Sequence, residues 1–166
     1  IKNFDPFDNY VKHIEGMIDF ELIASGNIKI VIDPMHGSGA GYLKMILEKH
    51  GIKAVEVNAN RDPLFGGQNP EPLPPELEEL ISETRETKLR NRDSITVGLA
   101  LDGDADRIAA VDESGTYISA HNILCILLRH LVEGKKMTGE VVKTFNITAL
   151  LTNLAKQYGL TVHETP

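Results

Sequence analysis

The sequence predicts an α/β fold: a three-layer α/β/α unit around a mixed, mostly parallel sheet, followed by an incomplete second α/β unit. Short apolar runs typical of strands alternate with amphipathic segments typical of helices. The alternation begins again late in the chain, so we expect one domain over residues 1–137 and the start of another over 138–166. A chain of 166 residues is long enough for one full domain and part of a second.

The first half of the chain opens with a predicted helix. Apolar residues recur at helical spacing over residues 7–24, which predicts one amphipathic helix that ends at Ser25-Gly26. A strand over 28–32 is expected next, and Asp33-Pro34 is expected to end it. The elements expected after it are a helix over 42–50 that ends at Gly51, a strand over 53–57 and an irregular connection over 58–75.

The second half begins with a helix that opens at Pro74-Pro75. An apolar run over 94–101 predicts a buried strand. A short turn should then join the strands expected over 107–112 and 116–118, so at least one edge of the sheet is antiparallel. The remaining expected elements are strands over 107–112 and 116–118, a helix over 120–133, a strand over 140–143, a helix over 148–158 and a strand over 160–163.

Composition and charge exclude some classes of function. The formal net charge of -7 and pI near 5.3 argue against a nucleic-acid partner or an anionic membrane surface. Cys125 is the only cysteine, so no intrachain disulfide forms and a cytoplasmic location is expected. No apolar run approaches the ~20 residues that span a bilayer. The start at Ile1 and the end at Pro166 suggest an excised fragment.

The most informative segment is an acidic loop that directly follows the strand expected over 94–101. Asp102, Asp104 and Asp106 alternate with small residues, and such close carboxylates repel one another unless a cation or protons neutralise them. Curled into a loop, they can converge on one Mg²⁺ and leave positions for water and a phosphate oxygen. Arg107 follows at once and adds a cationic fork suited to phosphate. The loop therefore predicts a metal site that handles phosphate.

Three other interpretations of this loop compete with a Mg²⁺ and phosphate site. An EF-hand would need Gly where Arg107 stands and helices on both sides, so that interpretation fails. A haloacid-dehalogenase-like phosphatase, with Asp102 as nucleophile, matches Asp102-Gly-Asp104 but not Asp106. A non-catalytic α/β interaction module, in which the loop is only a turn, is the third alternative.

Two further loops have weaker signals. Asp33-Pro-Met-His-Gly-Ser-Gly-Ala-Gly41 lacks the Lys-Ser/Thr of a phosphate-binding P-loop and a dinucleotide fingerprint, so a tight strand-to-helix turn is favoured. His36 in this loop could touch a ligand, yet nothing singles it out. The connection over 60–72 is interpreted equally as a stiff surface connection or as a substrate- or domain-facing loop.

Several of these motifs together resemble one enzyme family. Asp102-Gly-Asp-Ala-Asp-Arg107 followed by Val111-Asp-Glu-Ser-Gly115 resembles the metal-binding loop of the α-D-phosphohexomutases, the phosphoglucomutases and phosphomannomutases. The resemblance extends to Asp33-Pro-Met-His-Gly-Ser-Gly39, to Asn69-Pro-Glu-Pro72 and to Val162-His-Glu-Thr-Pro166. It covers nearly the whole sequence, and the acidic loop is its most specific part.

The resemblance implies that residues 1–137 are the second of four domains and that residues from 138 onward begin the third. It also implies an isomerase in which a phosphoserine of the first domain gives its phosphoryl group to a hexose phosphate and receives one back from the bisphosphate intermediate. Mg²⁺ would lie between Asp102, Asp104, Asp106 and the serine phosphate, with Arg107 on phosphate or sugar oxygens. The substrate would be a glucose and/or mannose phosphate.

The chain also departs from the family pattern. The serine loop, the later sugar-selecting loop and the basic last domain are absent from this sequence. We therefore expect the full-length parent to be a cytoplasmic phosphohexomutase whose remaining domains act in cis, and the isolated chain to be inactive.

Overall fold

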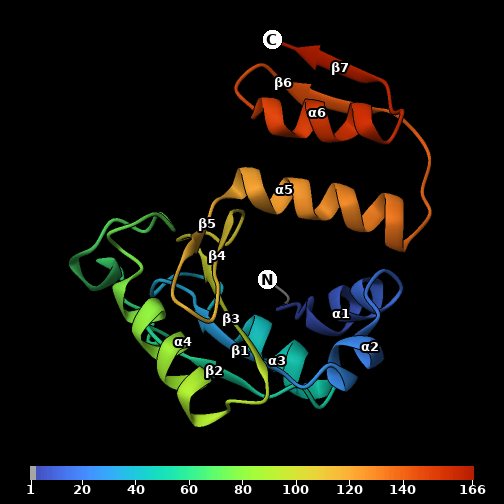
Figure 1. The fold of residues 1–166 in the computed structure, drawn as a ribbon. Helices are drawn as coiled ribbons and strands as arrows, with labels where there is room; N and C mark the ends of the chain where they lie inside the picture. The colour runs from blue at the N-terminus through green and yellow to red at the C-terminus, as the bar shows by residue number, and fades with distance from the viewer. Residues whose placement is uncertain (1–2) are drawn as a thin grey trace. The chain divides into compact units, whose positions relative to one another are not determined.

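The computed structural model describes residues 3–166, and their contacts divide the chain into two compact units. One comprises residues up to Tyr117, and the other comprises 118–166. The first unit contains α1 (Phe7–Glu15), α2 (Phe20–Ser25), β1 (Ile28–Asp33), α3 (Tyr42–Lys49), β2 (Ala54–Glu56), the 3₁₀ turn η1 (Phe65–Gly67), α4 (Glu78–Arg90), β3 (Ile95–Leu101) and β4 (Ile108–Val111), and the short strand β5 (Tyr117–Ile118) stands at the junction (Figure 1).

The five strands form one mixed sheet in the order β2-β1-β3-β4-β5. Strand β1 pairs in parallel with both β2 and β3, with Ile30 opposite Ala54 on one side and Val97 on the other. Strand β4 runs antiparallel to β3, with Gly98 opposite Val111. The predicted α/β class and mixed sheet are therefore confirmed, and the antiparallel pair in the sheet is β3 with β4.

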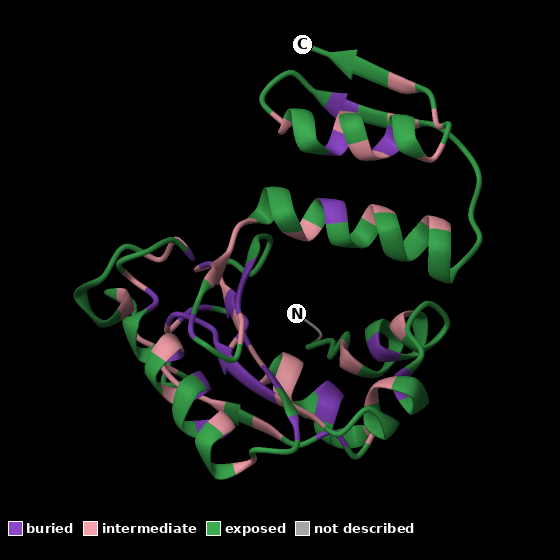
Figure 2. Cartoon of the chain, in the orientation of Figure 1, coloured by how far each residue is buried: buried purple, intermediate pink, exposed green. Residues whose placement is uncertain are grey.

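Helices cover both faces of this sheet because successive side chains of a strand point to opposite sides. Ile30 and Ile32 of β1 join the cluster that includes Val11 of α1 and Ile46 of α3. Val31 faces the other way and packs with residues of α4 and with Val111. Buried residues concentrate on the strands and on the inner sides of these helices (Figure 2). The result is the three-layer arrangement that the sequence predicted.

The helix predicted over residues 7–24 is wrong in one respect, because the structure has two helices there. Helix α1 ends at Glu15 with Gly16 as its C-cap. Asp19 then begins α2 by accepting a hydrogen bond from the Leu22 N–H at 2.9 Å. The apolar spacing continues across the break, so it could not reveal the interruption, whereas Asp19 is a favoured N-cap residue.

Two other helices differ at their ends from the sequence prediction. Helix α4 begins at Glu78 rather than at the two prolines and continues to Arg90. The helix expected over 120–133 is α-helical only as far as Arg129, and a π-helical turn follows.

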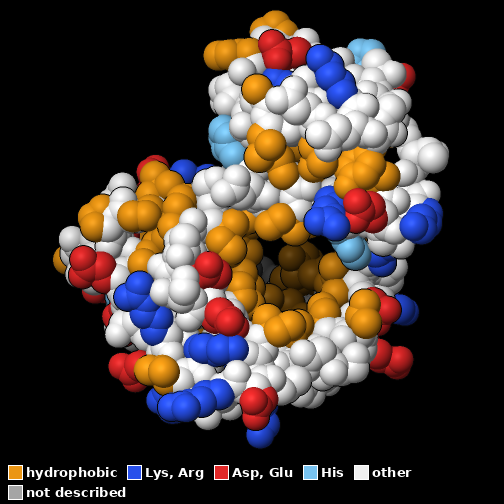
Figure 3. Space-filling view, viewed as in Figure 1, with side chains coloured by type: hydrophobic (Ala, Val, Ile, Leu, Met, Phe, Trp, Pro, Cys, Tyr) orange, Lys and Arg blue, Asp and Glu red, His pale blue; other side chains and the backbone are white. Residues whose placement is uncertain are grey.

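A hollow of about 620 Å³ lies in the first unit on the side of the sheet that α1, α2 and α3 cover. Its walls are mainly apolar and include Tyr10, Phe20, Leu43 and Leu99, and it reaches Asp104 of the acidic loop. Figure 3 shows hydrophobic side chains of the first unit lining this hollow.

The second unit is a small α/β piece with two parallel strands. Val141 of β6 (Val141–Thr144) lies opposite Val162 of β7 (Val162–Thr165), and Leu151 and Ala155 of α6 (Ala149–Gln157) are buried. The Tyr158 hydroxyl donates a hydrogen bond to Glu133 at 2.6 Å. The unit comprises α5 (Ala120–Arg129), the π-helical turn η2 (His130–Gly134), β6 (Val141–Thr144), α6 (Ala149–Gln157) and β7 (Val162–Thr165).

The predicted domain boundary between residues 137 and 138 stays a prediction. Across residues 3–166, no helix has the length and apolarity that crossing a membrane requires.

Candidate metal centre

The acidic loop lies at the carboxyl end of β3, beside the loop that leaves β1. Strands β1 and β3 are parallel neighbours, with Asp33 opposite Ala100, so their carboxyl ends open on the same edge of the sheet. Ligands of open α/β sheets bind at this edge. The fold therefore brings together two loops that are 60 to 70 residues apart in the sequence.

The three predicted metal ligands converge. One carboxylate oxygen each from Asp102, Asp104 and Asp106 lies within 4.8 Å of the other two. Asp102 is only 1% exposed, while Asp104 and Asp106 are exposed to solvent. Three hard oxygen donors that can face one point, two of them open to water, fit an ion such as Mg²⁺, which keeps several waters when it binds a protein.

Asp102 holds the loop in its curled form. Its Oδ1 accepts hydrogen bonds from the backbone N–H groups of Asp106 at 2.9 Å and Arg107 at 3.1 Å. Its Oδ2 accepts one from Arg107 Nε at 2.7 Å, so a lone pair of Oδ2 stays available for a cation. Burial acts to raise the pKa of Asp102, but the hydrogen bonds and charge of Arg107 outweigh it and the pKa is lowered.

Asp106 experiences the opposite effect. The negative charge of Asp104, and then that of Asp102, raises the pKa of the Asp106 carboxyl. Ala105, between Asp104 and Asp106, adopts a left-handed backbone conformation (φ 64°) in this turn. The loop therefore holds uncompensated negative charge, which a divalent cation would neutralise.

Gly103 is held from two sides by other parts of the first unit. Its N–H donates to the Pro70 carbonyl at 3.1 Å, and its own carbonyl accepts from the Ser38 N–H at 3.0 Å. Gly37 lies against it so closely that a Cβ at position 37 would be 2.5 Å from the Gly103 oxygen. The β1–α3 loop and the long connection thus both support the acidic loop.

The β1–α3 loop is a tight turn, as the favoured interpretation of the sequence had it. Asp33 is fully buried and accepts hydrogen bonds from the Met35 N–H at 2.8 Å and from Asn58 Nδ2 at 3.1 Å. Burial raises the pKa of Asp33. Met35 and His36 both have positive φ, and His36 is tied to the backbone of Asn60 by its ring Nδ1 at 2.9 Å.

Arg107, the predicted phosphate-binding residue, lies between carboxylates of two segments. Besides Asp102, it approaches Asp106 Oδ1 with Nε at 3.6 Å and Glu71 Oε1 with Nη1 at 3.5 Å. Its side chain is 58% exposed, and the hydrogen bonds and negative charges of Asp102 first, and then of Glu71, raise the pKa of its guanidinium. Glu71 was not singled out as a site residue from the sequence, because it lies 36 residues before Arg107.

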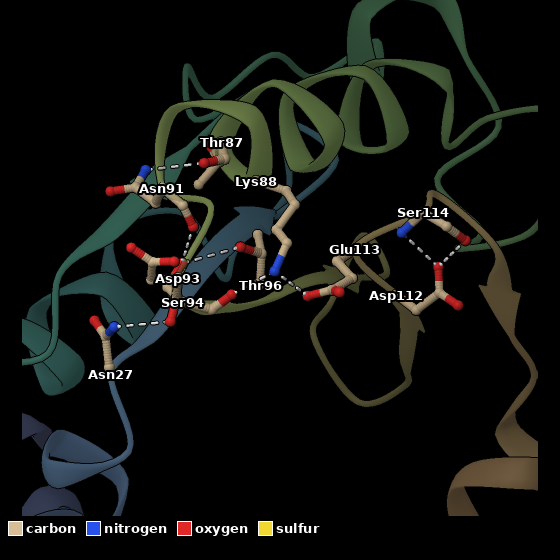
Figure 4. Close-up of polar contacts among 10 residues, drawn as sticks. All are labelled: Asn27, Thr87, Lys88, Asn91, Asp93, Ser94, Thr96, Asp112, Glu113 and Ser114. Carbon is tan, nitrogen blue, oxygen red and sulfur yellow. Dashed lines mark hydrogen bonds and ion pairs between the residues drawn. The ribbon is translucent and has the colours of Figure 1, made fainter.

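The segment Val111–Gly115, the second part of the motif that resembles the family, lies beside the start of β3. The acidic loop follows the opposite end of the same strand. Asp112 Oδ1 accepts hydrogen bonds from the Ser114 N–H at 2.9 Å, the Ser114 hydroxyl at 2.6 Å and the Thr116 N–H at 2.8 Å. Lys88 of α4 joins this turn to the start of β3 through Glu113 at 2.9 Å and the Ser94 carbonyl at 2.7 Å (Figure 4). This network fixes the sheet and does not reach the acidic loop.

Comparison with known proteins identifies the family. The family described as "Phosphoglucomutase/phosphomannomutase, alpha/beta/alpha domain II" matches residues 8–115. That stretch is more than half of the chain and includes the acidic loop. The chain therefore belongs to the phosphoglucomutase/phosphomannomutase family, and the resemblance to the α-D-phosphohexomutases is confirmed.

Individual relatives agree with this assignment. A phosphoglucomutase/phosphomannomutase of Thermococcus kodakarensis is 30% identical over 165 residues, which are 99% of this chain and 35% of the relative. A phosphoglucosamine mutase of Methanococcus vannielii is 29% identical over 156 residues, 92% of this chain and 34% of the relative. A crystal structure from Thermus thermophilus, described as a phosphomannomutase, superposes with a TM-score of 0.86 at 30% identity and covers 98% of this chain and 36% of that one.

The chain thus spans about a third of the length of these relatives. The family membership supports the predicted mutase class over a free-standing phosphatase.

Proposed function

We propose that this chain supplies the Mg²⁺ site of a phosphohexomutase, an isomerase that interconverts hexose 1-phosphate and hexose 6-phosphate of glucose and/or mannose through a phosphoserine and a bisphosphate intermediate. The observation that carries the proposal is the convergence of Asp102, Asp104 and Asp106 within 4.8 Å at the carboxyl end of β3, in a chain of this family. The hexose phosphate and the remaining mutase domains, in cis, are its proposed partners.

The residues of this chain have separate proposed roles. Asp102, Asp104 and Asp106 each supply one carboxylate oxygen, and Asp102 also fixes the loop through its hydrogen bonds to Arg107. Arg107 uses Nε on Asp102 and Nη1 on Glu71, and its remaining outer N–H groups are proposed to bind an oxygen of the transferring phosphoryl group. When bound, Mg²⁺ supplies positive charge that neutralises the charge spread over the phosphoryl oxygens.

The isolated 166-residue chain is proposed to bind Mg²⁺ weakly and to catalyse nothing. Its sequence has no counterpart of the serine loop that would carry the phosphoryl group. A coupled assay for glucose 6-phosphate formed from glucose 1-phosphate tests this directly, and turnover by the purified chain would overturn it. Mannose and glucosamine phosphates belong in the same assay, because one relative is a phosphoglucosamine mutase.

The metal site has its own test. Titration calorimetry with Mg²⁺ should give a binding signal that the double variant Asp104→Asn/Asp106→Asn lacks. Unchanged binding in that variant would place the ion elsewhere and would overturn the proposed site.

A further inference from the structure

We propose that Glu71 is a positioning residue for Arg107: it holds Nη1 of the guanidinium and so orients the remaining N–H groups for a phosphate oxygen. This inference rests on the proposed function. It starts from one contact, in which Glu71 Oε1 lies 3.5 Å from Arg107 Nη1. Glu71 is a carboxylate outside the metal triad that contacts Arg107.

The backbone around Glu71 is fixed, so its side chain starts from a defined place. The Glu71 N–H donates to the Asn69 carbonyl at 2.8 Å, and the Glu71 carbonyl accepts from the Leu73 N–H at 2.7 Å. The preceding carbonyl, of Pro70, accepts from the Gly103 N–H at 3.1 Å, and the next residue, Pro72, is buried. The segment that carries Glu71 is therefore attached directly to the acidic loop.

Arg107 would compete with a metal ion if the triad were its only anionic partner. Its Nε lies 2.7 Å from Asp102 Oδ2 and 3.6 Å from Asp106 Oδ1, so it already contacts two of the three proposed ligands. A guanidinium has five N–H donors in a fixed fork, and the side chain is 58% exposed. A partner on Nη1 limits how far this fork can turn toward Asp106.

Glu71 is well suited to this task because its own exposure keeps the contact moderate. Its side chain is 42% exposed, and exposed ion pairs are weak. It can therefore orient Arg107 without holding all of its donors. The outer donors of Arg107 stay open to solvent, at the edge of the sheet where the metal loop ends.

A double-mutant cycle on Mg²⁺ binding tests the proposal, because coupling energies isolate an effect that passes through one partner. Glu71→Gln should weaken Mg²⁺ binding by about two- to fivefold, the range of an exposed ion pair. Glu76→Gln is the matched control: it removes the same charge from the segment just before α4, five residues after Glu71. In an Arg107→Ala background, Glu71→Gln should weaken binding no more than Glu76→Gln does.

Equal losses from Glu71→Gln in both backgrounds would overturn the proposal, since the effect would then be one of net charge alone. The same holds if Glu76→Gln matches Glu71→Gln in the unmodified background.

A second measurement needs no metal and separates this inference from the proposed function. Nitrogen-detected NMR of the apo chain should resolve two distinct Nη signals for Arg107, because Asp102 on Nε and Glu71 on Nη1 hinder rotation about the Nε–Cζ bond. In Glu71→Gln the two signals should merge. Averaged signals in the unmodified chain would overturn the role of Glu71, even if Mg²⁺ binds. Resolved signals without Mg²⁺ binding would support it and contradict the metal site.

Discussion

Gly37 and Gly103 are in direct backbone contact, although they belong to different loops. A Cβ placed on Gly37 would be 2.5 Å from the Gly103 oxygen and 2.9 Å from its carbonyl carbon, closer than side-chain atoms approach backbone. The next residue, Ser38, donates its N–H to the same oxygen at 3.0 Å. The conformation of the acidic loop therefore depends on the conformation of the β1–α3 loop.

Replacing Gly37 by Ala should push the two loops apart. Overpacking of this kind costs about 1–3 kcal/mol, so we expect a lower free energy of unfolding by that amount. Mg²⁺ binding should weaken as well, because Asp102 and Asp104 flank the displaced Gly103. Chemical denaturation and calorimetry measure the two effects. Ser38→Ala is the control, since it keeps the backbone donor, and equal effects of the two variants would contradict this account.

Asp102 and Asp104 should differ in what they contribute to stability. Asp102→Asn replaces a buried carboxylate that accepts three hydrogen bonds, so unfolding should become easier by about 1–3 kcal/mol. Asp104 is exposed, and Asp104→Asn should change stability by no more than about 0.5 kcal/mol. Urea unfolding without metal compares the two. Similar losses in both variants would mean that Asp102 does not hold the loop.

The stability of the chain should fall in acid partly through Asp102. A lowered folded-state pKa gives a stabilisation that is complete above the unfolded pKa of about 3.9 and is lost as the pH falls through the folded value. Asp102→Asn should therefore flatten the acid limb of a plot of unfolding free energy against pH. An unchanged acid limb would assign that loss of stability to other carboxylates.

Mg²⁺ binding should weaken on acidification at a higher pH than an ordinary aspartate would require. The metal needs the ionised form of Asp106, whose pKa is raised by Asp104 and Asp102. Without metal, a raised folded-state pKa means that the ionised Asp106 destabilises the folded chain above that pKa. Asp106→Asn should therefore stabilise the apo chain at neutral pH. Calorimetry over a pH series measures the first effect, and thermal melting measures the second.

The turn at Asp112 should support the fold and leave the metal site alone. Asp112→Ala removes the acceptor of three hydrogen bonds and should lower the free energy of unfolding by about 1–2 kcal/mol. Asp112→Asn keeps one acceptor oxygen and should cost less. Mg²⁺ affinity should be the same in both variants, and a loss of affinity would link this end of β3 to the loop.

The strands and the convergence of the acidic loop could be predicted because their signals are local. The apolar run that becomes β3 and the three aspartates that follow it stand in one short stretch of sequence. The alternation of strands and helices then places this stretch at the carboxyl edge of the sheet. Arg107 was predicted beside the ligands for the same reason, since it directly follows Asp106.

The supporting contacts could not be predicted because they join distant residues. The pairing of Glu71 with Arg107 spans 36 positions, and the approach of Gly37 to Gly103 spans most of the first unit. The break before α2 was missed for another reason. Apolar spacing alone does not show where one helix stops and the next begins, and the capping role of Asp19 depends on its backbone leaving the helical conformation.

The most direct test of the central claim is a calorimetric titration of the folded 166-residue chain with Mg²⁺, repeated on Asp104→Asn. Asp104 is the best single probe, because it is exposed and its replacement should leave the fold intact. The account predicts one weak site in the unmodified chain and at least about a tenfold loss of affinity in the variant, within the range for removing a group that supports a metal site. Equal affinity in the two proteins would contradict it.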